Sequence, residues 1–209
     1  MAVKGAKYAR IAFLTADGTV DVEKGTKLGG DSNGVIKLDA DSVLGISEGD
    51  VSLGLSAGSA RYGSNQVIML TPSTPSPSIK LGALGIPEAL SAALLGLDDN
   101  GDGSYSLDDD TPANAPDVAI EFVATSVKSE KDVHFCLPRT NVTGGDVNAK
   151  TNDKNTQYAD DSFTFTALTK QGSNEIARIY NEADPNYDES KLLSTVFPQA
   201  GATTTTTIA

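Results

Sequence analysis

The stretch "PDVAIEFVATSVKSEKDVHFCLPR", Pro116 to Arg139, decides the fold class of this chain. Both of its halves are apolar at every second position. The alternating residues are Val118, Ile120 and Phe122 in the first half, then Val133, Phe135 and Leu137 in the second. Because successive side chains of a strand point to opposite faces, this spacing predicts two β-strands, each with one apolar face.

Similar short apolar segments separated by turn signals fill most of the sequence. In "DSFTFTALTK", Phe163 and Phe165 alternate with Thr164 and Thr166, and the turn "QGSN" follows. We expect "EIARIYNE", residues 175–182, to close a hairpin with that strand. The other expected strands are "KYARIAFLT" (7–15), "TVDVEKG" (19–25), "GVIKLD" (34–39), "GDVSLGLSAG" (49–58) and "NQVIMLTPS" (65–73), the last as a short buried run.

One helix is expected in "IPEALSAALLGL", residues 86–97. Pro87 suits a first helical turn and Gly96 suits a helix end. "DESKLLSTVF", residues 188–197, is a second short candidate. The apolar stripe of the first helix consists of Leu90, Ala93, Leu94 and Leu97.

The expected fold is therefore mainly β, an antiparallel β-sandwich or barrel with one flanking helix at about 86–97 and long loops. Residues 1–199 are expected to form a single domain, and the Thr-rich residues 200–209 a flexible tail. The prolines of "TPSTPSPS", residues 71–78, favour an extended, open loop because they cannot donate to a strand ladder.

The composition argues against several classes of function. There are 28 acidic residues against 16 basic ones, a net charge of −12, and the basic residues are scattered. Nucleic-acid binding needs a concentrated basic surface, so this chain is expected to repel DNA. Cys136 is the only cysteine, which excludes an intrachain disulfide. Without a signal-peptide pattern or an apolar run long enough to span a membrane, we expect a soluble protein made in the cytoplasm.

The acidic stretch "LDDNGDGSYSLDDD", residues 97–110, resembles a calcium-binding loop in its spacing. The residues of interest are Asp98, Asn100 and Asp102, then Gly103 and Asp109. However, two prolines and a strand pattern stand where an exiting helix should follow, and Asp109 is shorter than the usual Glu. We favour a polar hairpin turn at residues 100–103 that joins "LLGLD" to "SYSLD".

Catalysis is not expected. Asp132, His134 and Cys136 share one strand face, but they include the only histidine and the only cysteine of the chain. We interpret them as the mixed face of a strand rather than as a metal or thiolate site. The glycine clusters lack the spacing of a phosphate-binding loop. No catalytic residue, cofactor or metal site is therefore assigned, and the function is expected to lie in assembly with other copies.

Five segments, in this order, resemble a known family. They are "GAKYARIAFLTADGTV" (5–20), "SAGSARYGSNQV" (56–67), "IKLGALGIPEALSAALLG" (79–96), "DVAIEFVATSVKSEKDVHFCLPR" (117–139) and "DSFTFTALTK" (161–170). From Lys4 to Phe197 the chain looks like the major tail proteins of long-tailed bacteriophages, the tail tube subunits of the phi13 type. The polar insertion 98–116 falls where that family carries a variable hairpin.

The resemblance implies a structural virion protein of the phage tail, assembled in the host cytoplasm. Hexameric rings would stack into a hollow tube whose acidic wall lets DNA pass without binding it during ejection. Residues 56–82 are the candidate stacking loop, chosen by position and length. Further partners would be the tape measure, terminator and distal tail proteins. The alternative is a calcium-binding β-module of a surface or adhesion protein that uses the Asp98–Asp109 loop. A hydrolase with an unrecognised site is a third, weaker class.

Overall fold

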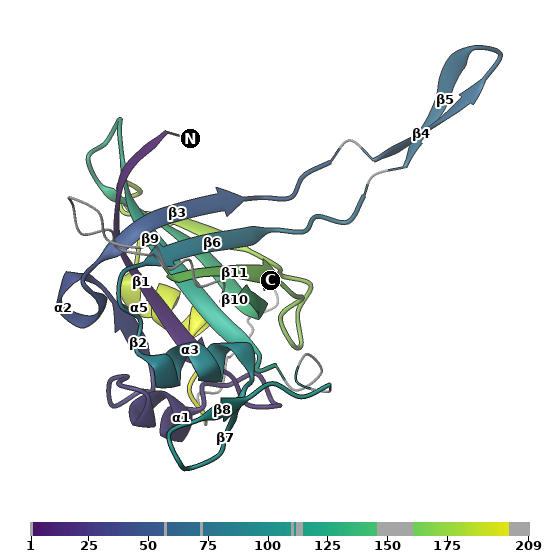
Figure 1. Ribbon diagram of the computed structural model, residues 1–209. Coiled ribbons are helices and arrows are strands. Elements are labelled where there is room, and N and C mark those ends of the chain that lie inside the picture. Colours follow the sequence, from purple (N-terminus) through teal and green to yellow (C-terminus); the bar gives the residue numbers. More distant parts are fainter. Residues whose placement is uncertain are drawn as a thin grey trace, which may run out of the picture.

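The computed structural model describes residues 2–56, 58–71, 73–109, 111, 115–145 and 161–200, and its largest element is an eight-stranded antiparallel sheet. The strands lie in the order β2-β1-β9-β10-β11-β6-β3, and β12 pairs with β10. Figure 1 shows a twisted, curved sheet from which one long projection leaves the body. The strands are β1 (Val3–Phe13), β2 (Ile36–Leu38), β3 (Ile46–Ser52), β6 (Ser78–Ala83), β9 (Val118–Ser126), β10 (Asp132–Gly144), β11 (Asp161–Ala167) and β12 (Arg178–Asn181).

The expectation of a mainly β, antiparallel fold is confirmed, although the described sheet is curved rather than closed into a barrel. Its curvature brings β3 back over β1 and β9. A side chain at Gly49 of β3 would collide with the ring of Phe122 in β9, so this close approach requires glycine. The main core fills the concave side. It includes Ile11, Phe13, Ile79, Leu81, Ile120, Phe122, Phe163 and Phe165.

The predicted helix is present as α3 (Glu88–Leu95), and it packs on the main core through Leu90 and Leu94. Gly96 ends the helix in the left-handed conformation, as its position in the sequence indicates. The backbone N–H of Ile86 donates to Asp161 Oδ2 at 3.1 Å, which ties the start of the helix to β11.

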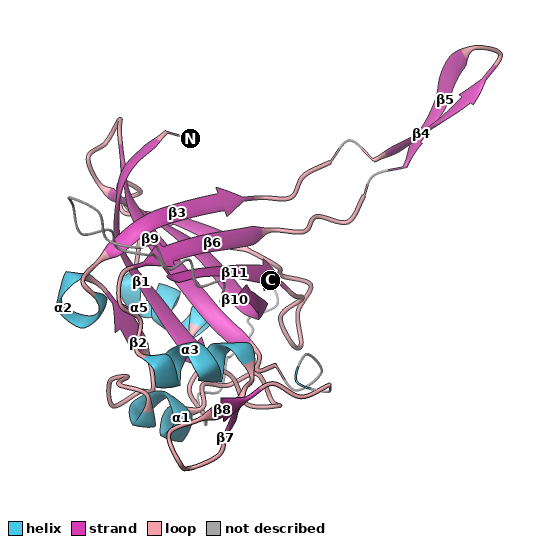
Figure 2. Ribbon diagram, viewed as in Figure 1, coloured by secondary structure: helices cyan, strands magenta, loops and turns pink. Residues whose placement is uncertain are grey.

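The second predicted helix, α5 (Glu189–Val196), covers the opposite face of β1, β9 and β10. The Asp188 side chain caps its first turn by accepting hydrogen bonds from the backbone of Ser190 and Lys191. A second, smaller core lies beneath it. This cluster includes Ala12, Val20, Ala119, Cys136, Leu192, Val196 and Phe197. The centre of the sheet is therefore buried on both faces. Figure 2 shows the helices that lie beside it.

The strand expected at residues 19–25 is wrong, because α1 (Val22–Lys27) forms there. The Asp21 side chain accepts a hydrogen bond from the Lys24 backbone at 3.0 Å and caps a helix where period-two spacing indicated a strand. Only Val20 makes a β-bridge, to Leu14. A further short helix, α2 (Ala40–Val43), was not expected and starts with a capping box between Asp39 and Ser42.

Two strand expectations need correction. Residues 178–181 do form a strand, but β12 pairs with β10 and not with β11, because β12 and β11 occupy successive halves of one edge of β10. The strand expected over 49–58 begins earlier, at Ile46, and ends at Ser52. Leu53 and Leu55 lie beyond its end and are exposed.

Candidate interaction surfaces

The projection in Figure 1 is formed by the described residues 53–56, 58–71 and 73–77, which we call the arm. It consists of two extended segments and the hairpin of β4 (Ser59–Gly63) and β5 (Gln66–Thr71). Ser64 and Asn65, both with positive φ, make the two-residue turn between these strands. Near the body, the Ser76 backbone N–H donates to the Gly54 carbonyl at 3.4 Å. The hairpin is thus held away from the sheet.

The "NQVIMLTPS" segment was expected to be buried, and this expectation is wrong for the isolated chain. Every residue of β4 and β5 whose burial is described is exposed, and Ile68 retains 70% of its accessible surface. The other large exposed side chains of the arm are Leu53, Leu55, Tyr62, Val67, Met69 and Leu70. A soluble monomer rarely exposes such a continuous apolar patch, so this surface indicates an interface.

A β-bulge divides the hairpin into two unlike faces. Ala60 lies opposite Leu70 and Tyr62 opposite Val67, and the extra residue Ile68 on β5 shifts the register between these pairs. Paired residues share a face, so these four form one apolar face. The other face is mostly polar. Its residues are Ser59, Arg61, Gln66, Met69 and Thr71.

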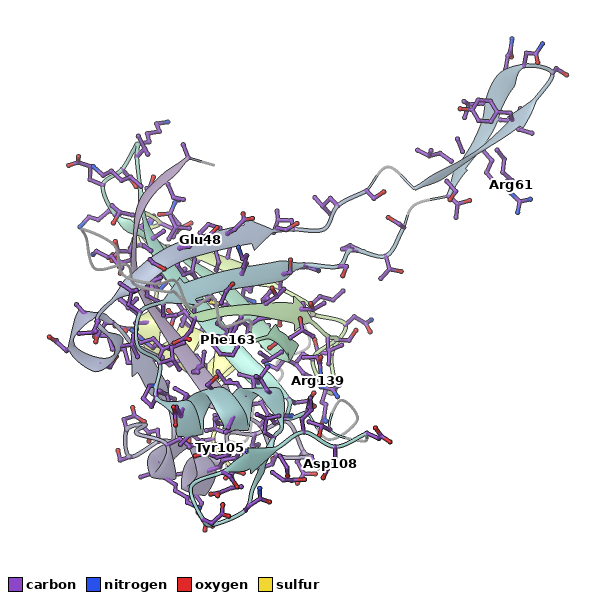
Figure 3. All side chains as sticks on the ribbon, viewed as in Figure 1. Glu48, Arg61, Tyr105, Asp108, Arg139 and Phe163 are labelled. Atoms are coloured by element: carbon purple, nitrogen blue, oxygen red, sulfur yellow. The ribbon has the colours of Figure 1, made fainter. Side chains whose placement is uncertain are left out.

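The arm also differs from the body in charge. Arg61 is the only charged residue between Leu53 and Pro77, although the whole chain carries 28 acids. Figure 3 shows Arg61 at the far end of the projection, away from the labelled acidic residues of the body. The arm can therefore approach the acidic surface of another copy without like-charge repulsion.

A second surface is the outward face of β3, β6, β11 and the end of β10. The register aligns polar residues in rows across these strands. One row contains Asn141, Thr166, Ser78 and Ser52; the next contains Thr143, Thr164, Lys80 and Asp50; the third contains Ser162, Gly82 and Glu48. In the described part of this face, Lys80 is the one cation, and its Nζ lies 3.3 Å from Glu48 Oε2.

The two ends of the sheet are also available for pairing. β2 and β3 are the terminal strands of the described order, and β3 is seven residues long. Glu48 and Asp50 of β3 are exposed. Charged residues on an edge strand discourage indiscriminate pairing, while an edge of this length can still extend a sheet into a selected partner.

The acidic stretch forms the predicted hairpin, with β7 (Asp98–Asp99) paired to β8 (Tyr105–Ser106). Two of its carboxylates serve the turn itself. Asp99 accepts from the Gly101 backbone at 2.9 Å, and Asp102 accepts from the backbone and hydroxyl of Ser104. The hydrogen bonds from Ser104 lower the pKa of Asp102. Among the described residues, no group of three potential ligands is placed to hold a metal ion.

Glu121 and His134 form a buried polar centre that the sequence did not single out as a pair. Both are essentially inaccessible, and Glu121 Oε1 lies 2.6 Å from His134 Nδ1. The Nε of Arg10 lies 3.4 Å from the other carboxylate oxygen, which has no hydrogen-bond partner among the described residues. A glutamate inside the apolar run "VAIEFVA" was the available signal, since a buried carboxylate needs a partner.

This centre fastens the C-terminal segment to the sheet. Arg10 Nη2 donates to Glu189 of α5 at 2.9 Å, and the Tyr187 hydroxyl lies 3.2 Å from His134 Nε2. The Tyr187 and His134 rings also stack, and burial raises the pKa of Tyr187. Glu121 and His134 are enclosed and bonded to each other, and the contacts that Arg10 and His134 make with Glu189 and Tyr187 position α5.

The structure places Asp132, His134 and Cys136 on one face of β10, as expected, but gives each a different partner. Asp132 Oδ2 lies 2.7 Å from Lys7 Nζ, and His134 contacts Glu121. Cys136 is 1% exposed within the smaller core, and burial raises its pKa well above the usual value. The interpretation of these residues as parts of a strand face agrees with this geometry.

Two grooves lie on the body. One, of about 380 Å³, lies between α1, α3 and the β7–β8 hairpin. The other, of about 740 Å³, lies beside α5 and contains Arg10, Asp31, Lys37 and Glu189. Within the described ranges, no helix is long and apolar enough to cross a membrane.

The comparisons with known proteins agree with these surfaces. No curated protein matches the chain in sequence. A family model described as phage tail tube protein matches residues 1–205, nearly the whole length. The chain therefore belongs to the phage tail tube protein family.

Proposed function

We propose that this chain is the subunit of a tube in which six copies form a ring, rings stack, and DNA passes through the hollow axis on ejection into the host. The observation that carries this proposal is the arm, whose apolar face is exposed in the isolated chain. Residues 1–199 act as the single tube-forming domain. Family membership makes the chain a structural component of the virion tail.

The arm supports contact between rings. It includes most of residues 56–82, the segment expected from the sequence to reach a neighbouring ring. Burial of apolar surface gives about 25 cal/mol per Å², so covering side chains such as Tyr62 and Leu70 stabilises stacking. The body does not bury these side chains, and another copy is the occupant that a tube provides.

The open sheet supports closure of each ring. The exposed edge of β3 can pair with a neighbouring copy, and a six-fold rotation repeats this contact until no edge remains free. The chain has a net charge of −12, which opposes association. Strand pairing and apolar burial must therefore supply the favourable free energy, and salt should assist assembly by screening the repulsion.

The polar face of β3, β6 and β11 supports the role of conduit wall. It presents Glu48 and Asp50 among serine and threonine side chains, and its cation Lys80 is paired with Glu48. A wall that held phosphates would release counterions and bind DNA. A surface with more carboxylates than ammonium groups repels the duplex and lets it slide.

Assembly with other tail proteins follows from the family. We further propose that the tape measure protein occupies the lumen during assembly in the host cytoplasm, and that terminator and distal tail proteins close the two ends. The role is mechanical rather than enzymatic: in the described residues, Glu121 and His134 are buried and bonded to each other.

Electron microscopy of the purified chain tests the proposal. Negatively stained samples, prepared across a range of protein and salt concentrations, should contain rings with six-fold symmetry and tubes made from them. These assemblies should persist in a calcium chelator, because Asp99 and Asp102 are used within the hairpin and no three potential ligands of the described residues are placed to hold a metal ion. A protein that stays monomeric under all conditions, or that loses its fold when calcium is removed, would contradict the proposal.

A further inference from the structure

We propose that the arm of one copy lies in the groove between α1, α3 and the β7–β8 hairpin of a second copy, with Arg61 against Asp98 and Asp99. This inference rests on the proposed function and adds the place where each arm docks. The arm and the groove are the two halves of the contact, and every copy of the chain carries one of each.

The groove is lined by apolar side chains that the chain itself covers only in part. Several of its apolar side chains are half-buried, among them Leu28, Ala93, Leu97 and Tyr105, while Ala89 is exposed. Leu28 and Ala93 already contact the main core on their inner sides. An apolar hairpin face placed over them would extend this core outward and remove further apolar area from water.

The apolar face of the arm offers matching groups. Tyr62, Val67 and Leu70 lie on that face, and all three are more than half exposed. A groove of about 380 Å³ takes a few side chains of this size and not a whole domain. The apolar face of a hairpin is therefore a suitable occupant.

Charge sets the direction in which the arm enters. The hairpin side of the groove carries Asp98 and Asp99, and the described residues from 97 to 109 include five aspartates and no basic residue. The opposite side carries Lys24 and Lys27. Arg61, the one charged residue of the arm, lies on the polar face of the hairpin, so its long side chain meets the rim of the groove rather than its floor. At the rim it is attracted to the first side and repelled by the second.

The arm and the groove lie at opposite ends of the molecule, so copies can stack one after another without closing a ring along the stack. In Figure 1 the arm leaves the upper right of the body from the ends of β3 and β6, whereas α1, α3 and β7–β8 lie at the bottom. Figure 3 shows the same separation between the labelled Arg61 and Tyr105. A contact between two different patches at opposite ends repeats head to tail without closing, and this produces a filament or tube.

The larger groove beside α5 fits the arm less well. Its charged groups have both signs, Arg10 and Lys37 with Asp31 and Glu189, and Arg10 already donates to Glu189. Both grooves carry two acidic and two basic residues, but Asp98 and Asp99 of the α3 groove lie side by side on β7, apart from the lysines of α1. Arg61 therefore meets a one-sided negative charge in the α3 groove, and charge complementarity favours that groove. The α5 groove provides the matched control for an experiment.

Disulfide trapping tests the contact, because native Cys136 is buried and its raised pKa keeps the thiol protonated. The test variant combines Ala60→Cys on the arm with Ala89→Cys at the groove. The control combines Ala60→Cys with Ser194→Cys, which lies at the α5 groove. Oxidation of assembled tubes of the test variant should give a ladder of covalent multimers on a denaturing gel, and the control should remain monomeric.

Charge reversal gives a second, independent measurement. Arg61→Glu should raise the protein concentration needed for tube formation at least tenfold at low salt. Adding Asp98→Arg should recover at least threefold of that loss, whereas Asp41→Arg, an equal charge change on α2, should recover none. The urea midpoint of each monomer, unchanged from the wild type, shows that the variants fold.

The possible outcomes separate the two proposals. The docking site is wrong if wild-type tubes form but covalent multimers appear only in the control variant, or in neither variant. The proposed tube still stands in that case. An absence of tubes in the wild type overturns the proposed function. A ladder from the test variant together with recovery by Asp98→Arg supports the docking contact.

Discussion

The strands β9 and β5 have similar sequences and opposite surroundings. "VAIEFVATS" in β9 and "QVIMLT" in β5 both place apolar residues at consecutive positions. The first seven residues of β9 are buried, with one core on each face, whereas β5 is exposed throughout. Both patterns indicate a strand that needs cover on more than one side. Only β9 receives that cover from its own chain.

The difference shows what an apolar run does and does not specify. It specifies that water should be excluded, and it does not specify which molecule excludes it. The arm begins with Leu53 after β3 ends and returns through a proline-rich segment that cannot join a ladder, so the chain itself holds β5 away from the body. In the proposed tube, this separation places part of the apolar surface against a neighbouring copy.

The largest expected effect on stability is in β9. Phe122→Ala should lower the free energy of unfolding of the monomer by about 3–5 kcal/mol, because it removes a buried ring and leaves a cavity. Gly49 lies against that ring and has no side chain with which to fill the space. Urea denaturation followed by circular dichroism measures the change. A loss below about 1 kcal/mol would mean that β9 is not the centre of the core.

The sequence was sufficient to predict this centre. Alternation at Val118, Ile120 and Phe122 indicated a strand and one of its faces correctly, and the helix ending at Gly96 was also predicted. In these segments local preference and tertiary packing favour the same structure. The strand expected at 19–25 was wrong because one side-chain cap, from Asp21, outweighed the period-two pattern.

A somewhat smaller effect is expected from the buried Glu121–His134 pair beneath α5. His134→Ala removes the hydrogen-bonded partner of Glu121 and leaves a carboxylate in an inaccessible site, so the free energy of unfolding should fall by about 3 kcal/mol. His134→Gln, which retains an N–H donor, should lose less. Thermal or urea unfolding of the two variants provides the comparison. If both variants lost the same free energy of unfolding, the stabilisation by His134 would come from ring packing on Tyr187 and not from the hydrogen bond to Glu121.

The candidate surfaces were less predictable than the core. The sequence located the segment of the arm but interpreted Val67 to Leu70 as buried, since burial within a chain and burial between chains produce the same pattern. The division into two faces depends on the bulge at Ile68, and a bulge has no reliable signature in a run of apolar residues. The pairing of Glu121 with His134 depends on the register between β9 and β10, which composition does not reveal.

The cap of α5 should have a modest effect. Asp188→Ala removes acceptors for the backbone N–H groups of Ser190 and Lys191 and should cost about 1 kcal/mol of stability. Asp188→Asn retains an acceptor and serves as the matched control, with a loss of a few tenths of a kcal/mol. The rate at which a thiol reagent labels Cys136 reports the same change, because that thiol lies under α5 and reacts only when the segment opens.

The smallest expected effect on the monomer is in the arm. Leu70→Ser should change the free energy of unfolding by less than about 0.5 kcal/mol, since Leu70 is 56% exposed and lies outside both cores. The same substitution should nevertheless abolish tubes in electron micrographs, because it removes a side chain from the apolar face of the hairpin. Gln66→Ser, on the polar face, should leave tubes intact.

These two variants separate the explanations for an exposed apolar strand. If Leu70→Ser destabilised the monomer as Phe122→Ala does, the arm would pack on its own body in solution, and β5 would resemble β9 after all. If neither arm variant affected tubes, the exposed face would have no partner. Unchanged monomer stability together with lost assembly would mean that β5 is a core strand whose core forms only when another copy arrives.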